Sequence, residues 1–131
     1  MSPGIQQVET GRMTRPQSVQ KGTLRDTVMW ILGRRSRVRI EGNSMQPALQ
    51  DGQTVLVHPT AYHTRLPLVG DIILARHPIQ GDIQMVKRVD QVLPDRRVLI
   101  RGDNPGESTD SRSFGALRPE HVLGRVVSTF P

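Results

Sequence analysis

The chain of 131 residues contains no cysteine, which excludes disulfide bonds, thiol chemistry and a cysteine-based zinc site. Its histidines show no metal-ligand spacing, so we expect neither a metal nor a cofactor and interpret them as surface or loop residues: His58, His63, His77 and His121. No apolar run approaches the roughly 20 residues that cross a bilayer. The most apolar early stretch covers only residues 28–32, and nothing before it resembles a signal peptide. We therefore expect no membrane span, and the missing cysteine fits a cytoplasmic location.

Acidic residues are also scarce relative to basic ones, which gives a net charge of +6. Residues 1–36 hold six basic and two acidic side chains, or +4, so the excess lies mainly outside any groove of a folded domain. We therefore expect no nucleic-acid partner. Residues 1–22 are rich in Gln, Gly, Thr, Ser and Pro and are predicted to be a flexible basic tail.

Residues 23–36 are predicted to form a short helix or a linker, and residues 37–131 one folded domain. The helix would pack on the domain or rest weakly on a membrane surface, and we favour packing on the domain, or disorder, because the stretch is short. Short runs of β-forming residues follow, separated by turn residues such as Gly, Asp and Pro. The predicted strands are Arg37–Glu41, Thr54–His58, Ile72–Arg76, Ile83–Leu93, Val98–Arg101 and Val122–Thr129. This spacing predicts a mainly β, antiparallel, partly barrel-like fold.

Lys87 is the one lysine beyond residue 21, in a chain with sixteen arginines that we expect at the surface. Alternate residues of its strand share one face, here Ile83, Met85, Lys87 and Val89. Desolvation on an apolar face lowers the pKa of an amine, and a lysine, unlike an arginine, can then lose its proton. Lys87 is therefore a candidate general base. Taken alone, Lys87 is more typical of a lysine that snorkels from the edge of a sheet.

A serine follows a short predicted strand, in the sequence Gly42-Asn43-Ser44-Met45-Gln46-Pro47. Gly42 permits a positive φ or a close backbone approach, and Pro47 suits the first turn of a short helix. Backbone N–H groups around such a serine can form an oxyanion hole, and a neutral lysine can activate its hydroxyl. Taken alone, Ser44 is more typical of a helix cap.

Residues 101–115 are rich in Gly, Asn, Pro, Asp and Ser, which by itself is typical of a polar surface loop. Together, the three segments resemble the bacterial signal peptidase I group of Ser-Lys peptidases, from about Val38 to Val127. The resemblance rests on four motifs in the right order: Gly42–Pro47, Gly70-Asp71-Ile72, Lys87-Arg88-Val89, and Gly102-Asp103-Asn104 with Ser108, Asp110, Ser111 and Arg112.

By position, the resemblance implies that Ser44 is the nucleophile, Lys87 the general base and Ser108 the serine whose hydroxyl orients that lysine. It also implies an ion pair between Asp110 and Arg112 that holds the loop. The other residues expected to support the site are Gly42, Met45, Pro47, Gly102, Asp103 and Asn104. Many relatives carry a serine where this chain has Gly42, so only backbone donors such as the Ser44 N–H remain for the oxyanion.

The resemblance implies a signal-peptidase or LexA type of peptidase fold and a serine endopeptidase that binds an extended peptide beside a strand edge. Ordinary members carry a membrane anchor before the nucleophile, and we expect none here. Residues 102–115 closely resemble a soluble branch of the family that removes the N-terminal prosequence of nickel-type superoxide dismutase. The expected partner is therefore the precursor of that dismutase.

Two other functions stay open. A LexA-like regulator would use the same Ser-Lys chemistry to cleave itself, but the 36 residues before the domain are too short for a convincing helix-turn-helix. A non-catalytic peptide-binding domain of the same fold is the third hypothesis, and the presence of both Ser44 and Lys87 argues against it.

Overall fold

The computed structural model describes residues 33–130 of the chain. The predicted tail and most of the predicted helix, residues 1–32, lie outside the described residues, so both stay predictions. The strands are β1 (Ser36–Arg39), β2 (Thr54–His58), β3 (Ile72–Arg76), β4 (Gln84–Val92), β5 (Val98–Arg101) and β6 (Val122–Thr129). Three short helical elements complete the described part: η1 (Pro105–Glu107), α2 (Ser111–Phe114) and η2 (Pro119–His121).

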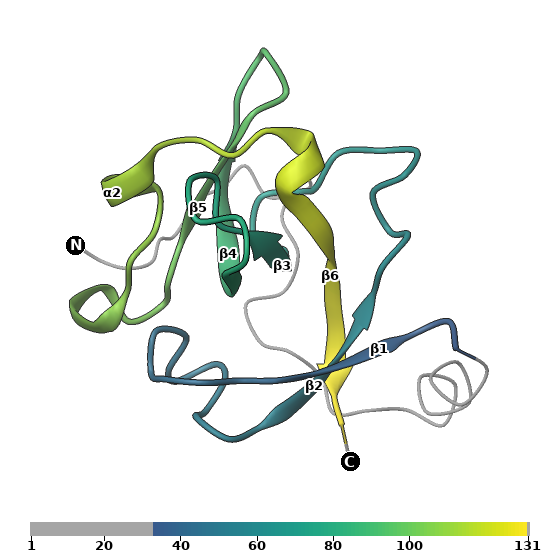
Figure 1. Cartoon of the computed structure of the whole chain (residues 1–131), viewed down its shortest axis with the longest axis vertical. Coiled ribbons are helices and arrows are strands. Elements are labelled where there is room, and N and C mark those ends of the chain that lie inside the picture. The colour runs from purple at the N-terminus through teal and green to yellow at the C-terminus, as the bar shows by residue number, and fades with distance from the viewer. Residues whose placement is uncertain (1–32, 131) are drawn as a thin grey trace.

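The strands form one antiparallel sheet in the order β1-β2-β6-β3-β4-β5, which confirms the predicted mainly β, antiparallel class. β6 is the central element, because it pairs with β3 through Val122–Arg125 and with β2 through Arg125–Thr129. Figure 1 shows the result: β1 and β2 cross the lower part of β6, while β3, β4 and β5 lie beside its upper part. Within residues 33–130, no helix is long and apolar enough to span a membrane.

β3 lies between two hydrophobic clusters. Its apolar run is buried on both faces, because alternate side chains point to opposite sides of a strand. Ile72 and Leu74 belong to the first cluster, with Ile40, Met45, Leu49, Val55, Val57 and Val126. Ile73 and Ala75 belong to the second cluster, with Val89, Val98, Ile100 and Leu117. The two clusters thus meet at β3, the strand beside the one that carries Lys87.

β4 carries Lys87 on the face that the alternating pattern predicts. Val89 belongs to the second cluster and Met85 packs against it, and Lys87 lies between these two residues along the strand. The strand begins at Gln84, one residue later than predicted, and Ile83 is left 42% exposed at its start. The sheet therefore places a single amine among apolar neighbours, where water is largely excluded.

Candidate functional site

Ser44 lies on a turn that leaves β1. Gly42 has a φ of +87°, a conformation that side chains rarely adopt, and its N–H donates to Asp51 Oδ1 at 2.8 Å. The chain can therefore turn sharply before Ser44. Met45, 1% exposed, anchors the turn in the first cluster.

The short helix expected at Pro47 is not formed, since residues 44–48 make a turn. Gln46 N–H donates to the Asn43 carbonyl at 3.2 Å, which closes a turn three residues long. The next bond, from Leu49 N–H to the Met45 carbonyl at 2.9 Å, spans four residues but is not continued. A single such bond does not make an α-helix, so Pro47 belongs to a loop.

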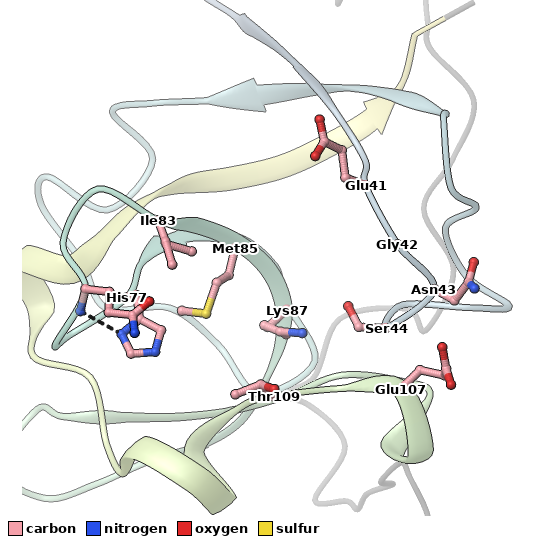
Figure 2. Close-up of a pocket in the computed structure, with 11 residues that line it drawn as sticks. Glu41, Gly42, Asn43, Ser44, His77, Ile83, Met85, Lys87, Glu107 and Thr109 are labelled. Atoms are coloured by element: carbon pink, nitrogen blue, oxygen red, sulfur yellow. Dashed lines mark hydrogen bonds between the residues drawn. The ribbon is translucent and has the colours of Figure 1, made fainter.

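Lys87 is 5% exposed, and its Nζ donates to Ser108 Oγ at 3.1 Å. Burial lowers the pKa of the Lys87 amine from its ordinary value. The negative charge of Asp110 opposes this shift and the positive charge of Arg112 adds to it, so the pKa stays lowered. Figure 2 shows the amine of Lys87 pointing toward the hydroxyl of Ser44.

Asp110 orients the Ser108 hydroxyl from the other side. Its carboxylate is fully buried and accepts from Ser108 Oγ at 3.0 Å and from the Gly102 N–H at 3.1 Å. Arg112 binds both of its oxygens, Nε at 2.9 Å and Nη2 at 3.0 Å. Burial raises the pKa of Asp110, but the hydrogen bonds from Arg112, Gly102 and Ser108 outweigh it and leave the pKa below its ordinary value.

The hydrogen bonds fix which way the Ser108 proton points. An ionised carboxylate only accepts, so the Ser108 hydroxyl must donate its single proton to Asp110. The oxygen of Ser108 can then only accept from Lys87. A neutral Lys87 amine that donates to Ser108 keeps its lone pair for another group.

Gly102 and Asn104 hold the serine turn against the loop that carries Ser108. Asn104 N–H donates to the Ser44 carbonyl at 2.8 Å, and Asn104 Nδ2 donates to the Asn43 carbonyl at 3.1 Å. A Cβ atom at Gly102 would lie 2.7 Å from the Ser44 carbonyl oxygen and would overlap the side chain of Ser108. Glycine is therefore the residue that lets the two segments approach this closely.

Asp103 pairs with Arg88 rather than with any group in the cleft. Arg88 binds it through Nε and Nη2, both at 2.8 Å, and also donates from Nη1 to the Gly70 carbonyl at 2.9 Å. At 6% exposure, Arg88 corrects the expectation that the arginines lie at the surface. Its guanidinium is buried because a bidentate carboxylate and a carbonyl satisfy it.

Ser44 and Lys87 lie together in a cleft of about 440 Å³. Its other lining residues are Glu41, Gly42, Asn43, His77, Gln80, Ile83, Met85, Glu107 and Thr109. Sequence reasoning missed His77, Glu41, Gln80, Glu107 and Thr109 as neighbours of the site. Glu41, Glu107 and Thr109 are direct sequence neighbours of predicted site residues, a signal that could have found them, whereas His77 and Gln80 reach the cleft only through the hairpin between β3 and β4. Asp103, Asn104, Asp110 and Arg112 lie outside the lining and are connected to the site through the contacts described above, while Pro47 also lies outside the lining.

One side of β4 is open along the cleft. Gln84–Lys87 pair with β3 on one side, while pairing with β5 begins only at Arg88. Residues 84–87 therefore have no neighbouring strand on the other side among the described elements. An extended peptide can add to such an edge through main-chain hydrogen bonds. Within residues 33–130, no three His, Cys, Asp or Glu side chains gather in a way that could hold a metal ion.

This arrangement can activate a serine without a histidine. A hydroxyl becomes a nucleophile when an adjacent base accepts its proton, and a lysine serves as that base once desolvation lowers its pKa. Lys87 meets this condition, and Ser108 restricts the direction of its amine.

Comparison with known proteins points to the same segments. A family model for signal peptidases, peptidase S26, matches residues 27–96, a stretch that includes Ser44 and Lys87 but ends before Ser108. Subunit 1 of the mitochondrial inner membrane protease of Xenopus tropicalis is 30% identical over 104 residues, 65% of this chain. A probable signal peptidase I-1 of Synechocystis is 25% identical over 70% of this chain, and signal peptidase I of Pseudomonas aeruginosa 29% identical over 70%.

The matched parts cover unequal shares of these relatives. The chain spans 62% of the Xenopus protein, 68% of the Synechocystis protein and 34% of the Pseudomonas protein. The family model alone matches more than half of this chain, over the turn of Ser44 and the strand of Lys87. The chain belongs to the signal peptidase family, peptidase S26.

Proposed function

We propose that the chain is a serine endopeptidase with a Ser-Lys dyad. The observation that carries the proposal is the buried Lys87 amine, whose pKa is lowered and which Ser108 holds while it points toward Ser44. Ser44 Oγ attacks the peptide carbonyl carbon while its proton passes to Lys87 Nζ. Backbone donors, among them the Ser44 N–H, stabilise the oxyanion.

Lys87 then acts as an acid and afterwards again as a base. It returns the proton to the leaving amine as the carbon–nitrogen bond breaks, which leaves an acyl ester on Ser44. A water molecule attacks this ester and gives its proton to Lys87, and the ester bond to Ser44 Oγ breaks. Lys87 passes this proton to Ser44 Oγ and the new carboxylic acid leaves, so the enzyme gains and loses no proton or electron over the cycle.

The substrate in this proposal is an extended peptide segment of another protein, lying along the open edge of Gln84–Lys87. This edge leads directly to Lys87, so a peptide paired with it passes between that amine and the Ser44 turn. Main-chain pairing orders the peptide without regard to its sequence, and side-chain subsites in the cleft supply selectivity.

The more specific proposal is that this peptide is the prosequence of nickel-type superoxide dismutase, cleaved in the cytoplasm. It is supported by the resemblance of residues 102–115 to that soluble branch and by the missing cysteine. The compared relatives bear the names of signal peptidases and of a mitochondrial inner membrane protease, so the substrate needs a direct test. Incubating the purified dismutase precursor with the chain should give one new N-terminus by mass spectrometry. An uncleaved precursor alongside cleaved peptides would contradict this substrate and leave the peptidase assignment standing.

Two substitutions test the dyad itself. Ser44→Ala and Lys87→Arg should each lower the rate of peptide cleavage at least about a thousandfold, the latter because arginine supplies no neutral amine. Ser113→Ala, an exposed serine of α2, is the matched control and should cleave at the wild-type rate. A Ser44→Ala protein with wild-type activity would refute the nucleophile. Incubating the chain alone also tests the LexA-like alternative, because self-cleavage would shorten it.

A further inference from the structure

The hairpin between β3 and β4, residues 77–83, is held by a histidine side chain. His77 Nδ1 accepts from the Ile79 N–H at 3.1 Å and from the Gln80 N–H at 3.0 Å. The backbone N–H of His77 donates to the Ile83 carbonyl at 2.9 Å, and the Ile83 N–H donates to the Gln80 carbonyl at 2.9 Å. One imidazole thus satisfies two N–H groups at a hairpin tip that would otherwise depend on water.

The imidazole also connects the hairpin to the loop behind Ser108. Its ring centroid lies 4.7 Å from that of Phe114 in α2, in a tilted arrangement. Because both partners of Nδ1 are N–H donors, this nitrogen carries a lone pair and the ring proton lies on Nε2. His77 therefore has a definite tautomer and a fixed position, although the chemistry of Ser44 and Lys87 does not use it.

The part of the hairpin that His77 holds lines the cleft. His77, Gln80 and Ile83 all contribute to the lining, and Met85 continues it toward Lys87. Figure 2 shows Ile83 and Met85 on the same side of the cleft as His77, with Lys87 beyond them. Ile83 is 42% exposed, so this wall offers an apolar surface that nothing in the described residues covers.

We propose that His77 is a positioning residue that fixes this hairpin as a specificity wall, with Ile83 and Met85 receiving an apolar side chain of the substrate. The inference rests on the proposed peptidase function and adds a selectivity determinant to it. His77 does not touch the reacting atoms. Its two hydrogen bonds set the path of residues 79–83, and this path decides where Ile83 stands relative to Met85.

The test uses a synthetic peptide pool in which each position is varied among Ala, Leu, Gln, Glu and Lys. The position at which the wild type prefers Leu over Gln identifies the wall. His77→Ala should raise KM for the Leu peptide about tenfold, the effect of losing one to two hydrogen bonds, with kcat changed less than about twofold. The preference for Leu over Gln should fall by a similar factor.

His77→Asn separates positioning from a merely structural role. Asparagine places Oδ1 where histidine places Nδ1, and it accepts from backbone N–H groups two and three residues on, as in an Asx turn. This variant should restore KM and the Leu preference to within about threefold of wild type. His121→Ala is the matched control, because His121 Nδ1 accepts from the Arg118 N–H at 3.2 Å but does not line the cleft. It should leave KM and selectivity unchanged.

The possible outcomes separate a failure of the specificity wall from a failure of the proposed peptidase function. Cleavage with an unchanged Leu preference in His77→Ala, or no rescue by His77→Asn, would overturn the wall and leave the peptidase intact. If no peptide is cleaved, the proposed function fails, and fluorescence anisotropy of a labelled Leu peptide bound to Ser44→Ala, with and without His77→Ala, still tests the wall. Binding that His77→Ala does not weaken about tenfold, or no binding at all, would refute the inference.

Discussion

The burial of the Lys87 amine favours the proposed chemistry but lowers the free energy of unfolding. Its amine is buried among apolar neighbours with one hydroxyl as its hydrogen-bond partner, and its pKa is lowered. Between this lowered value and the ordinary 10.5, the unfolded chain holds a proton that the folded chain has released. The free energy of unfolding therefore rises with pH across this window, and below it the full cost of burying the cation remains.

We accordingly expect Lys87→Met to be inactive but more stable than wild type. At neutral pH the gain should be on the order of 1 kcal/mol, because an apolar side chain of similar length removes a buried charge. Thermal unfolding followed from neutral pH to pH 10 should show the gain shrinking as pH rises. A variant less stable than wild type at every pH would contradict the desolvated amine.

The same lowered pKa predicts how cleavage depends on pH. In the proposed mechanism the reactive form of Lys87 is neutral, so kcat/KM for a peptide should rise with pH to a plateau, with an apparent pKa below 10.5. Initial rates at several pH values, with folding checked at each by circular dichroism, give this value. A rate independent of pH in the same range would argue against Lys87 as the base.

A methyl group added at Gly102 should disrupt the approach of the Ser44 turn to the loop of Ser108. A Cβ atom there would overlap Ser108 and crowd the Ser44 carbonyl, so Gly102→Ala should force the two serine-bearing segments apart. We expect kcat to fall at least about a hundredfold, because a displacement of about 1 Å is enough for that. Gly106→Ala in η1 is the control, since a Cβ there meets nothing within 4 Å. Equal kcat values for the two variants would contradict the close approach.

At the level of elements, the loop from Gly102 to Arg112 depends on one buried carboxylate. Asp110 accepts five hydrogen bonds, including those from Ser108 Oγ and the Gly102 N–H, and three of the five come from Arg112. The pKa of Asp110 is lowered, so its contribution to stability is present above the ordinary 3.8 and is lost as pH falls through the lower folded value.

Asp110→Ala should therefore destabilise the loop and the chemistry together. We expect a loss of about 2 kcal/mol in unfolding free energy, since hydrogen bonds to a charged group are broken and donors are left without acceptors. Hydrogen exchange should accelerate in residues 102–112. Asp95→Ala, which breaks the exposed ion pair with Arg97, is the control and should leave the melting temperature unchanged. Equal exchange rates in wild type and Asp110→Ala would show that the loop is held by something else.

The strands could be predicted from the sequence because their signals are local. Alternating apolar residues and turn residues place β2, β3, β5 and β6 at the observed bounds, and β1 and β4 within one or two residues. The face of Lys87 also follows from alternation alone. These features depend on neighbours one to four positions away, which a sequence displays directly.

The remaining features depend on contacts between distant segments. The pairing of Arg88 with Asp103 brings together residues fifteen positions apart, and although both lie in motifs, neither motif identifies the partner of the other. His77 joins the cleft only because β3 and β4 form a hairpin beside α2. Pro47, expected in a helix, lies in a turn because Met45 is drawn into the core while Asn104 binds the Ser44 carbonyl.

For the whole molecule, the residues of the proposed chemistry all lie between positions 44 and 108. Ser44, Lys87 and Ser108 all fall within the described residues, and the family match begins at residue 27. Deleting residues 1–22 should therefore leave kcat/KM for a short peptide within about twofold of wild type. Activity on a protein substrate can still fall, because this segment carries a share of the positive charge. Loss of peptide cleavage with the fold preserved would place the deleted residues in the active site.

The two hydrophobic clusters have a further consequence for this site. Ser44 is fixed to the first through Met45, whereas Lys87 lies between Met85 and Val89, which contact the second. The two residues of the proposed dyad are therefore anchored to different clusters, and β3 contributes to both clusters. The distance between Ser44 and Lys87 should change if either cluster loosens. Leu49→Ala or Ile100→Ala, which truncate buried side chains that do not line the cleft, should therefore slow the reaction at temperatures below the melting transition. The cleavage rate would then report how well the two hydrophobic clusters are packed.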